Sequence, residues 1–593
     1  MTDYHEIKTK IKGEVETDEA SLVKYSRDAS IFEIKPACIV HPKDAEDVKA
    51  LVKWANGTKE ANPGLSITAR SAGTDMSGGA IGESIICEFP AHFNKIIKIE
   101  SSSAFPNPHP LLRQGFGGQA DPLPGGEGRK YTDGLATVEP GVYYRDFEKA
   151  TLEKGLILPC YTASKSLNTL GGMVANNSAG EKSLSYGQTK DYVQELSLVL
   201  SDGNEYAFGE LNEHELEQKL KLTGFEGEIY RKMFRLLKDN YQEIQKAKPT
   251  TSKNSAGYLL WEVWDKAKSK FNMAKIFTGA QGTLGLITKI KIRLVKPKTK
   301  SGLLVVFMKD LANLGDVVAM IGKYKPESFE SFDDHTFNLA MRFLPDMIKR
   351  MFANGESASG GKGSFNLITL GLQFLPELWM TITGGVPKLI LIAEFTGDSE
   401  QEIREKIFLA QKEVISKFKL KTHVTKNEAE AQKYWVVRRE SFNLLRQHTH
   451  GLSTAPFIDD IVVHPAQLPQ FLPELNAILA KYPSLIYTIA GHAGDANFHI
   501  IPLMDLTKED QRKIIPELAD LVYDLVIKYG GSITAEHNDG LIRSPYLEKM
   551  YGAEITGLFA QVKAIFDPKN IFNPGKKVGS SLKFAMEHIK KTL

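Results

Sequence analysis

Two histidines in the C-terminal half of the chain are spaced so that they could bind a metal ion together. His492 and His499 stand in a stretch that follows an apolar run at residues 485–490 and leads into another at 498–503. Gly494 lies between them among turn formers, so the stretch predicts a tight hairpin. A hairpin would bring the two imidazoles side by side, one from each arm. Such a pair suits zinc, manganese or iron.

A third ligand is available downstream. Gly530-Gly531 opens another apolar run, which ends in Glu536 and His537. Two histidines and one carboxylate leave coordination positions open, which is typical of a catalytic metal site rather than a structural one. Alternatives stay open at this point. The histidines could be ordinary hairpin residues, Glu536 could pair structurally, and His537 could be a fourth ligand or a core histidine.

Three stretches rich in small residues suggest a second binding function. They are Ser71–Gly79, which follows a strand-like run at 65–70, then Gly171–Gly180, and then Thr278–Gly285, which precedes a strand-like run at 286–294. Backbone with few side chains can lie against a phosphate or a planar ligand. None of the three is a Walker A loop or a dinucleotide fingerprint.

Composition limits the classes of protein to consider. A length of 593 residues predicts two or more domains, and a net charge of +2 with no basic stripe argues against nucleic acid as a partner. Three scattered cysteines exclude an iron–sulfur run and fit a reducing compartment. The N-terminus is polar, and no run of about 18 apolar residues occurs, so neither a secretory signal nor a spanning helix is predicted. We therefore expect a cytoplasmic protein.

The pattern of elements predicts an α+β fold. Residues 101–130 are rich in Ser, Pro and Gly and are expected to form a disordered insertion. After a linker at 296–300, strand-like runs alternate with helical ones up to residue 525, which favours an antiparallel sheet. The expected domains are 1–297, 298–525 and 526–593.

Seven motifs occur in an order that resembles a known family. They are Arg70–Gly79, Gly171–Gly180, Tyr186–Val193, Gly279–Gly285, Gly491–His499, Glu536–Gly540 and Asn573–Lys576. Together they resemble the FAD-linked 2-hydroxyacid dehydrogenases of the vanillyl-alcohol-oxidase superfamily. Relatives in that family include FAD-dependent D-lactate dehydrogenases, the flavin subunit of glycolate oxidase and D-2-hydroxyglutarate dehydrogenase.

The resemblance implies a two-part, PCMH-type FAD-binding domain with an inserted α+β substrate domain. It also implies non-covalent FAD, because no residue matches a covalent flavin attachment. The residues that would bind FAD by this resemblance are Arg70, Ser71, Gly73, Thr74, Asp75, Ser77, Pro140, Gly141, Gly171, Gly172, Asn176, Ser178, Gly180, Tyr186, Gly187, Asp191, Gly282, Thr283, Ile287, Asn573 and Lys576.

The same resemblance assigns the reaction site. His492, His499 and Glu536 match the ligands of a divalent metal (zinc, manganese or iron), and His537 matches the catalytic base. Arg438 stands where relatives place an arginine for the substrate carboxylate. The competing interpretation is that Arg438 is a solvated helix charge beside Arg439.

The implied reaction is oxidation of a D-2-hydroxy acid, D-lactate first, to the 2-oxo acid. The form of the Glu536–Gly540 motif resembles a subgroup that is fused to an iron–sulfur domain, so a quinone or an iron–sulfur partner is the expected acceptor. Two alternatives are a flavin-dependent transferase resembling alkylglycerone-phosphate synthase and an electron-transfer flavin subunit. The oligomeric state and the metal's identity stay open.

One apolar segment, Phe365–Ile382, could touch a membrane. It has a single charge, Glu377, and Pro376 breaks any continuous helix. A buried helix pair is the expected form. The alternative is a patch that rests on the membrane interface, where quinone is available, which would make the protein peripheral to the membrane.

Overall fold

The computed structural model describes residues 4–101, 133–334, 387–447 and 451–591. The expected insertion, beyond residue 101, and the apolar segment 365–382 lie outside the described residues. The chain divides into two compact units. The first unit consists of residues 1–297 and 532–591, and the second of residues 298–531.

The first unit contains a small mixed sheet. Its strand order is β1-β2-β4-β3, in which β4 pairs in parallel with both β2 and β3. The strands are β1 (Glu14–Glu16), β2 (Cys38–His41), β4 (Ile85–Glu88) and β3 (Ile67–Arg70). Strands β2 and β4 are short and mainly apolar because both faces are covered, whereas β1 at the edge has two partly or fully exposed glutamates. Helix α2 (Ala45–Thr58) packs its apolar face, Val48, Leu51, Val52 and Ala55, into the same core.

A larger antiparallel sheet forms the rest of the first unit. Its order is β5-β6-β11-β7-β8-β10-β9. The strands are β5 (Ile96–Ser101), β6 (Gly134–Val138), β11 (Leu286–Leu294), β7 (Val193–Val199), β8 (Glu205–Leu211), β10 (Lys270–Asn272) and β9 (Trp264–Asp265). Along β11 the buried positions alternate, as a strand with one covered face requires. The strand predicted at 286–294 is thus confirmed.

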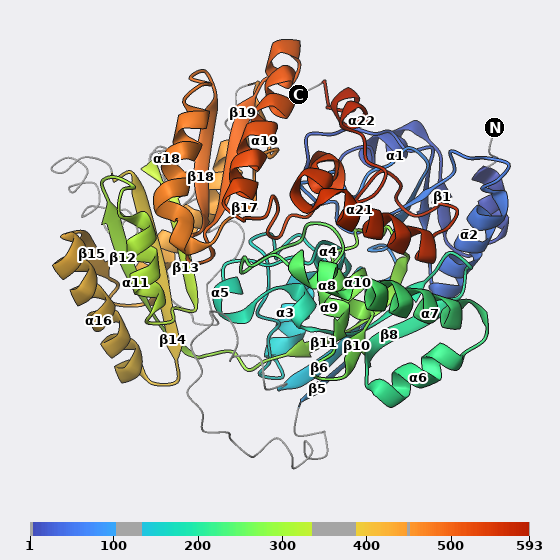
Figure 1. The fold of residues 1–593 in the computed structure, drawn as a ribbon, viewed down its shortest axis with the longest axis horizontal. Helices are drawn as coiled ribbons and strands as arrows, with labels where there is room; N and C mark the ends of the chain where they lie inside the picture. Colours follow the sequence, from blue (N-terminus) through green and yellow to red (C-terminus); the bar gives the residue numbers. More distant parts are fainter. Residues whose placement is uncertain (1–3, 102–132, 335–386, 448–450, 592–593) are drawn as a thin grey trace. The chain divides into compact units, whose positions relative to one another are not determined.

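The C-terminal segment returns to the N-terminal sheet of this unit. Ile67 forms a parallel bridge with Phe572, and Phe32 an antiparallel bridge with Ile589. Figure 1 shows α21 (Leu547–Phe566) and α22 (Leu582–Glu587), drawn in red, in the same unit as the blue N-terminal elements. The first unit also contains the helices α3 (Tyr144–Leu152), α4 (Leu170–Asn176) and α7 (Gly224–Asp239).

The second unit is built on one antiparallel sheet. Its order is β15-β12-β14-β13-β18-β19-β16, and β17 also pairs with β19. The strands are β15 (Lys421–Val424), β12 (Lys300–Met308), β14 (Leu389–Gly397), β13 (Ser328–Asp333), β18 (Ile486–His492), β19 (Asn497–Met504), β16 (Ser453–Thr454) and β17 (Ile461–Val462). The expected α+β class with an antiparallel sheet is confirmed.

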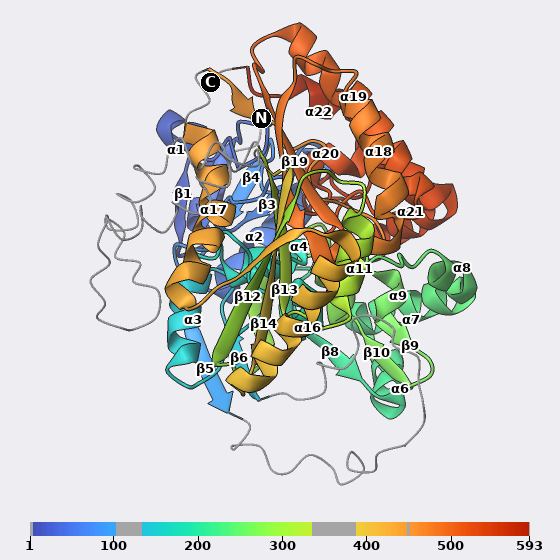
Figure 2. The ribbon, with the colours of Figure 1, turned by 90° about the vertical axis from the view of Figure 1, so that its left-hand side faces the viewer.

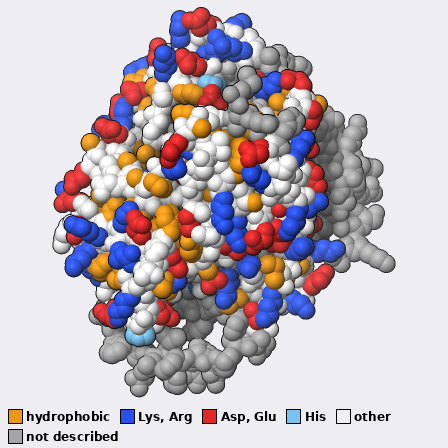
Figure 3. All heavy atoms as spheres, turned by 90° about the vertical axis from the view of Figure 1, so that its right-hand side faces the viewer, with side chains coloured by type: hydrophobic (Ala, Val, Ile, Leu, Met, Phe, Trp, Pro, Cys, Tyr) orange, Lys and Arg blue, Asp and Glu red, His pale blue; other side chains and the backbone are white. Residues whose placement is uncertain are grey.

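Helices cover this second sheet. Figure 2 shows α11 (Leu314–Gly322) and α16 (Glu400–Phe418) lying over β12 and β14. The remaining helices are α17 (Glu428–Gln447), α18 (Leu468–Leu479) and α19 (Glu509–Lys528). No helix in the described ranges is both long and apolar enough to cross a membrane. On the face drawn in Figure 3, basic and acidic side chains are interspersed.

A partly buried ion cluster lies beside the large sheet of the first unit. Glu262, on α9 (Leu260–Val263), contacts the Lys190 ammonium at 2.7 Å, and its side chain is 22% exposed. Burial alone would raise the pKa of Glu262. The charges of Lys190, Lys275 and Lys248 outweigh burial and lower that pKa to about 2. Because the folded pKa lies below the unfolded value, this carboxylate stabilises the fold above pH 4.5 and loses that effect as the pH falls toward 2.

We expect Glu262→Gln to lower the free energy of unfolding at pH 7 by about 2 kcal/mol. The difference from wild type should shrink as the pH falls below 4.5, since the wild-type carboxylate then becomes protonated. Thermal melting at several pH values measures this. Glu228→Gln is the matched control, because Glu228 pairs with Lys232 on the exposed face of α7 and should change little. A constant difference at every pH would contradict the prediction.

Candidate functional site

The first small-residue stretch forms a loop that is closed by its own aspartate. After β3, the Asp75 carboxylate accepts hydrogen bonds from the backbone N–H of Ser77 at 3.1 Å and of Gly79 at 2.6 Å. It also accepts one from the Asn176 side-chain amide at 2.8 Å, so the loop is fixed to the end of α4. Arg70 donates to backbone carbonyls, among them Arg27 at 2.7 Å. The structure therefore places Arg70 as a support for the base of this loop.

The third stretch and the C-terminal return meet the first loop. The Gln281 side chain donates to the Ser77 hydroxyl at 3.1 Å and accepts from the Gly540 backbone at 2.8 Å. Fully buried Asn573 donates to the carbonyls of Gly79 at 2.9 Å and Gln281 at 2.7 Å. Four stretches that lie far apart in the sequence, and that are predicted to bind the same ligand, are thus brought together within the first unit.

The second stretch contains two adjacent glycines that differ in their surroundings. A methyl group on Gly171 would lie 2.6 Å from the Pro140 carbonyl oxygen, so the protein itself needs a glycine there. A methyl group on Gly172 would lie 3.5 Å from the Thr169 hydroxyl and 3.6 Å from Ser71 Cβ, which are ordinary contacts. Gly172 thus has room for a methyl group between α4 and the first loop, a place that we call the cofactor cradle. That FAD binds there stays a prediction.

Several other predicted cofactor residues support the backbone of this unit. A Cβ on Gly180 would lie 2.0 Å from the Tyr161 carbonyl oxygen, and Gly282 adopts a left-handed φ of 66°. The Thr283 hydroxyl is buried against the Tyr258 hydroxyl at 2.7 Å. The remaining predicted residues are spread over several elements. They lie in the loop after β3 (Gly73 and Thr74), after β6 (Gly141), after α4 (Ser178), at the end of the short helix α5, Ser183–Tyr186 (Tyr186 and Gly187), at the end of a 3-10 helix (Asp191) and on β11 (Ile287).

Two ionisable groups are buried near the first loop. Lys576 donates to the Ile81 carbonyl at 2.8 Å, and its burial lowers its pKa to about 8. Asp28 accepts from the Ser30 backbone at 3.0 Å, while its second oxygen is buried without a hydrogen-bond partner. Burial first, and then the charge of Asp75, raise the pKa of Asp28 to about 7. Burial thus favours the neutral form of both side chains.

Glu536 and His537 are held by residues of the first unit. The Lys253 ammonium contacts a Glu536 oxygen at 2.9 Å, and both side chains are buried. The Ala535 carbonyl accepts from the side chains of Gln188 and Ser255, each at 2.9 Å. The structural pairing considered for Glu536 is therefore present. His537 is 24% exposed, so it is not a core histidine.

The next residue ties this pair to the predicted flavin-binding stretches. The Asn538 amide donates to the carbonyls of Asn176 at 3.1 Å and Gly279 at 2.9 Å. Asn538 is fully buried and has a left-handed φ of 68°. The backbone of the predicted metal ligand and base is therefore fixed by the same elements that form the cofactor cradle.

In the second unit the predicted hairpin is confirmed. Strands β18 and β19 pair with Ala490 opposite His499 and with His492 opposite Asn497. Figure 1 shows the two strands with β17 in orange. The ring centroids of His492 and His499 are 5.2 Å apart, and the rings stand at 84°. The expectation that the two imidazoles lie side by side is thus met.

Each histidine of the pair is oriented by a buried carboxylate. His492 Nδ1 lies 2.6 Å from Glu330, and His499 Nδ1 lies 2.9 Å from Asp459. A histidine that donates from Nδ1 carries its lone pair on Nε2, which is the arrangement common in metal-binding histidines. The chemistry of this donor set therefore fits a divalent metal. Neither carboxylate was predicted from sequence.

Arg438 is not a solvated charge. It lies on α17 with 14% of its side chain exposed and contacts the second oxygen of Glu330 at 3.1 Å. Arg439 beside it is exposed and stacks on the Trp435 ring. The arginine that the resemblance assigns to the substrate carboxylate is thus one side chain away from His492. Whether it binds substrate stays a prediction.

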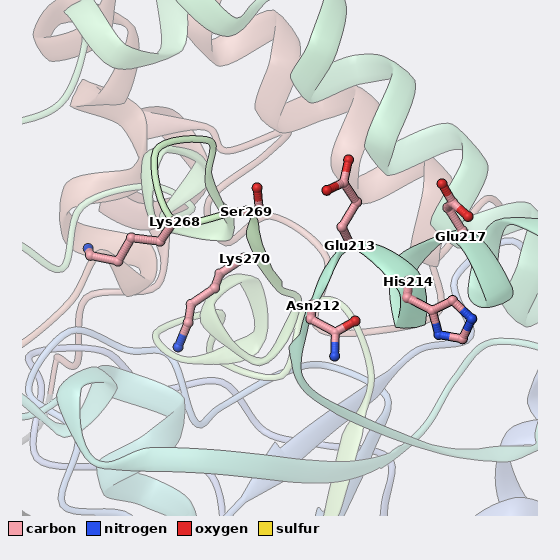
Figure 4. A pocket seen from close by; sticks show the side chains of 7 residues that line it. All are labelled: Asn212, Glu213, His214, Glu217, Lys268, Ser269 and Lys270. Atoms are coloured by element: carbon pink, nitrogen blue, oxygen red, sulfur yellow. The ribbon is translucent and has the colours of Figure 1, made fainter. Parts of the chain in front are cut away.

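A surface hollow elsewhere in the first unit is not a catalytic site. It is lined by Asn212, Glu213, His214, Glu217, Lys268, Ser269 and Lys270. Figure 4 shows that the labelled side chains diverge and do not point toward a common centre. None of the lining residues belongs to a motif described above.

Only weak sequence signals mark the residues that were not predicted. Asp459 stands with Asp460 inside an apolar run at 457–463, whereas Glu330 lies among other polar residues at 327–334. Both carboxylates are buried and therefore need partners. Gln188 stands inside the Tyr186–Val193 motif without a distinctive neighbour. Lys253 has no local pattern that marks it.

Comparison with known proteins gives two domain matches. Residues 297–577 match the family described as FAD linked oxidases, C-terminal domain, and residues 120–209 match FAD binding domain. The chain is therefore similar to FAD-linked oxidases over residues 297–577 and to FAD-binding domains over residues 120–209.

Two relatives and one solved structure are similar to the chain. It is 26% identical over 569 residues to D-2-hydroxyglutarate dehydrogenase of Pseudomonas putida, covering 95% of this chain and 50% of the relative. It thus spans about half the length of that relative. It is 25% identical over 547 residues to D-lactate dehydrogenase of Anaerostipes hadrus, covering 91% and 89%. An alkyldihydroxyacetonephosphate synthase structure has a TM-score of 0.60 at 13% identity, covering 97% of this chain and 85% of that one, which shows the fold alone.

Gly172→Ala tests the cradle. The protein has room for the methyl group, and alanine favours a helix, so the variant should fold. We expect FAD affinity to fall about 10-fold because the methyl group would meet the bound cofactor. Flavin content per chain and titration with FAD measure this. Gly57→Ala is the control, since a methyl group there meets nothing within 4 Å. Unchanged FAD affinity would show that the cofactor does not approach Gly172.

Proposed function

We propose that this chain oxidises a D-2-hydroxy acid to the 2-oxo acid with non-covalent FAD, and that D-lactate is the first substrate to test. The observation that carries the proposal is the histidine pair of β18 and β19, with each Nδ1 on a carboxylate, in a chain that is similar to FAD-linked oxidases. The D-lactate dehydrogenase relative, which the chain covers over 89% of its length, supports the choice of D-lactate.

The metal proposal keeps the three ligands that the resemblance assigns. His492 and His499 would offer Nε2, and Glu536, which Lys253 contacts at 2.9 Å, would offer a carboxylate oxygen. When bound, FAD would accept hydride from the α-carbon, and a zinc, manganese or iron ion would lower the pKa of the substrate hydroxyl.

The other side chains have roles in binding and proton transfer. His537 would accept the hydroxyl proton at a ring nitrogen, because a neutral imidazole is a suitable base near pH 7. Arg438 would bind the substrate carboxylate. A guanidinium has five N–H donors, so a contact with Glu330 is compatible with holding a second carboxylate.

Electrons would leave the flavin for a quinone or an iron–sulfur protein. No sequence motif of this chain is a dinucleotide fingerprint, and the Glu536–Gly540 motif resembles a subgroup that carries an iron–sulfur domain. The transferase alternative differs in outcome because it would give no net oxidation of substrate. The first test below therefore separates the two.

Wild-type protein should show bleaching of its flavin spectrum under anaerobic conditions with D- but not L-2-hydroxy acids. His499→Ala should keep the flavin spectrum, while its bleaching rate falls more than about 100-fold because a metal ligand is lost. His423→Ala is the matched control in the same unit, since His423 pairs at the surface with Glu430. Rapid bleaching by His499→Ala, or by metal-free wild type, would contradict the metal role.

The acceptor prediction needs a separate measurement. Purified enzyme with D-lactate should reduce a soluble quinone analogue and should not form NADH from NAD. The reason is that hydride transfer to NAD requires a binding site for NAD, and no sequence motif of this chain predicts such a site. Stoichiometric formation of NADH would show that the acceptor has been misassigned.

A further inference from the structure

Glu330 joins two groups that the proposed reaction uses separately. One of its oxygens lies 2.6 Å from His492 Nδ1, and the other lies 3.1 Å from an Arg438 terminal nitrogen. The Glu330 side chain is 1% exposed, so these two contacts compensate a charge that is fully removed from water. The carboxylate thus bridges an imidazole on one side and a guanidinium on the other.

The fold fixes this bridge through the register of the sheet. Strands β13 and β18 pair with Ser331 opposite Gly491 and with Phe332 opposite Ala490. Continuing the register by one residue sets Glu330 opposite His492. Arg438 belongs to the helix α17, which is not part of this strand pairing. A helix and a hairpin arm are therefore tied to one another by a single carboxylate.

We propose that Glu330 is a positioning residue that sets the metal-binding imidazole and the substrate-binding guanidinium at a fixed separation. The inference rests on the proposed function. Accepting from Nδ1 directs the lone pair of His492 to Nε2, toward a metal. Accepting from Arg438 fixes the plane of the guanidinium fork, which a bidentate contact with a substrate carboxylate requires.

The chemistry requires a carboxylate at this position. Both partners donate, so position 330 must supply two acceptors at once. A glutamine has the same shape but only one acceptor oxygen, and its amide nitrogen would face another donor. Glu330→Gln should therefore disturb both partners together, whereas a change in either partner alone should disturb one function.

Two measurements on the purified FAD-containing protein test this. The first is the zinc dissociation constant, obtained by competition with a chelator, and the second is the KM for the hydroxy acid that bleaches wild type most. His492→Ala should weaken zinc binding without a matching change in KM, and Arg438→Lys should do the reverse. Glu330→Gln should weaken zinc binding about 10- to 100-fold and also raise KM about 10-fold.

Asp333→Asn is the matched control. Asp333 lies on the same strand, is buried, and accepts from the Ile489 backbone of the same hairpin at 2.9 Å. It should change neither quantity more than about 2-fold. If Asp333→Asn produced the same double loss as Glu330→Gln, Glu330 would be an ordinary support of the strand and the proposal would be overturned.

The remaining outcomes are distinguishable. Unchanged zinc affinity and KM in Glu330→Gln would overturn the bridge and leave the proposed function standing. A wild-type protein that neither binds zinc nor is reduced by any hydroxy acid would overturn both. Should Glu330→Gln fail to fold, Glu330→Asp gives a second test. Its side chain is one methylene shorter and cannot reach both partners, so retention of both properties would also count against the bridge.

Discussion

The first unit depends on the requirement that buried polar groups find partners. Asn573 is fully buried, and its amide donates to the carbonyls of Gly79 and Gln281, while its oxygen accepts from the Thr68 hydroxyl at 3.1 Å. These contacts join the C-terminal return to the loop after β3 and to the turn before β11. An unpaired amide there would cost about 1–3 kcal/mol, so the closed arrangement is strongly favoured. The segments that are predicted to bind the cofactor lie together because of these contacts.

The same rule explains the charged pairs around the proposed reaction groups. Glu536 has Lys253, His492 has Glu330, and His499 has Asp459. Every one of these partners is nearly inaccessible to solvent. Buried ion pairs contribute little net stability compared with apolar packing, whereas loss of one partner is costly. Their value here is orientation, since each one restricts a side chain that must meet a ligand at a defined atom.

The sequence predicted those features that depend on residues close together along the chain. The hairpin of His492 and His499 follows from two strand-like runs and the turn formers between them, and the structure confirms it. Strand β11 likewise agrees with the strand-like run predicted at 286–294. Glu330 could not be placed from the sequence, because its partners His492 and Arg438 are far along the chain. Only the register of β13 against β18 brings it opposite His492.

Arg438 shows why the type of a residue does not determine its role. Beside Arg439 in the sequence, it has the same charge and the same helix, yet Arg439 is exposed and Arg438 is largely buried against Glu330. The difference arises from which side of α17 meets the sheet. A guanidinium held on a buried carboxylate is already oriented before substrate arrives, which reduces the entropy lost on binding. Family resemblance identified the residue, and the contact with Glu330 gives a physical reason why this position, rather than its neighbour, suits recognition of a carboxylate.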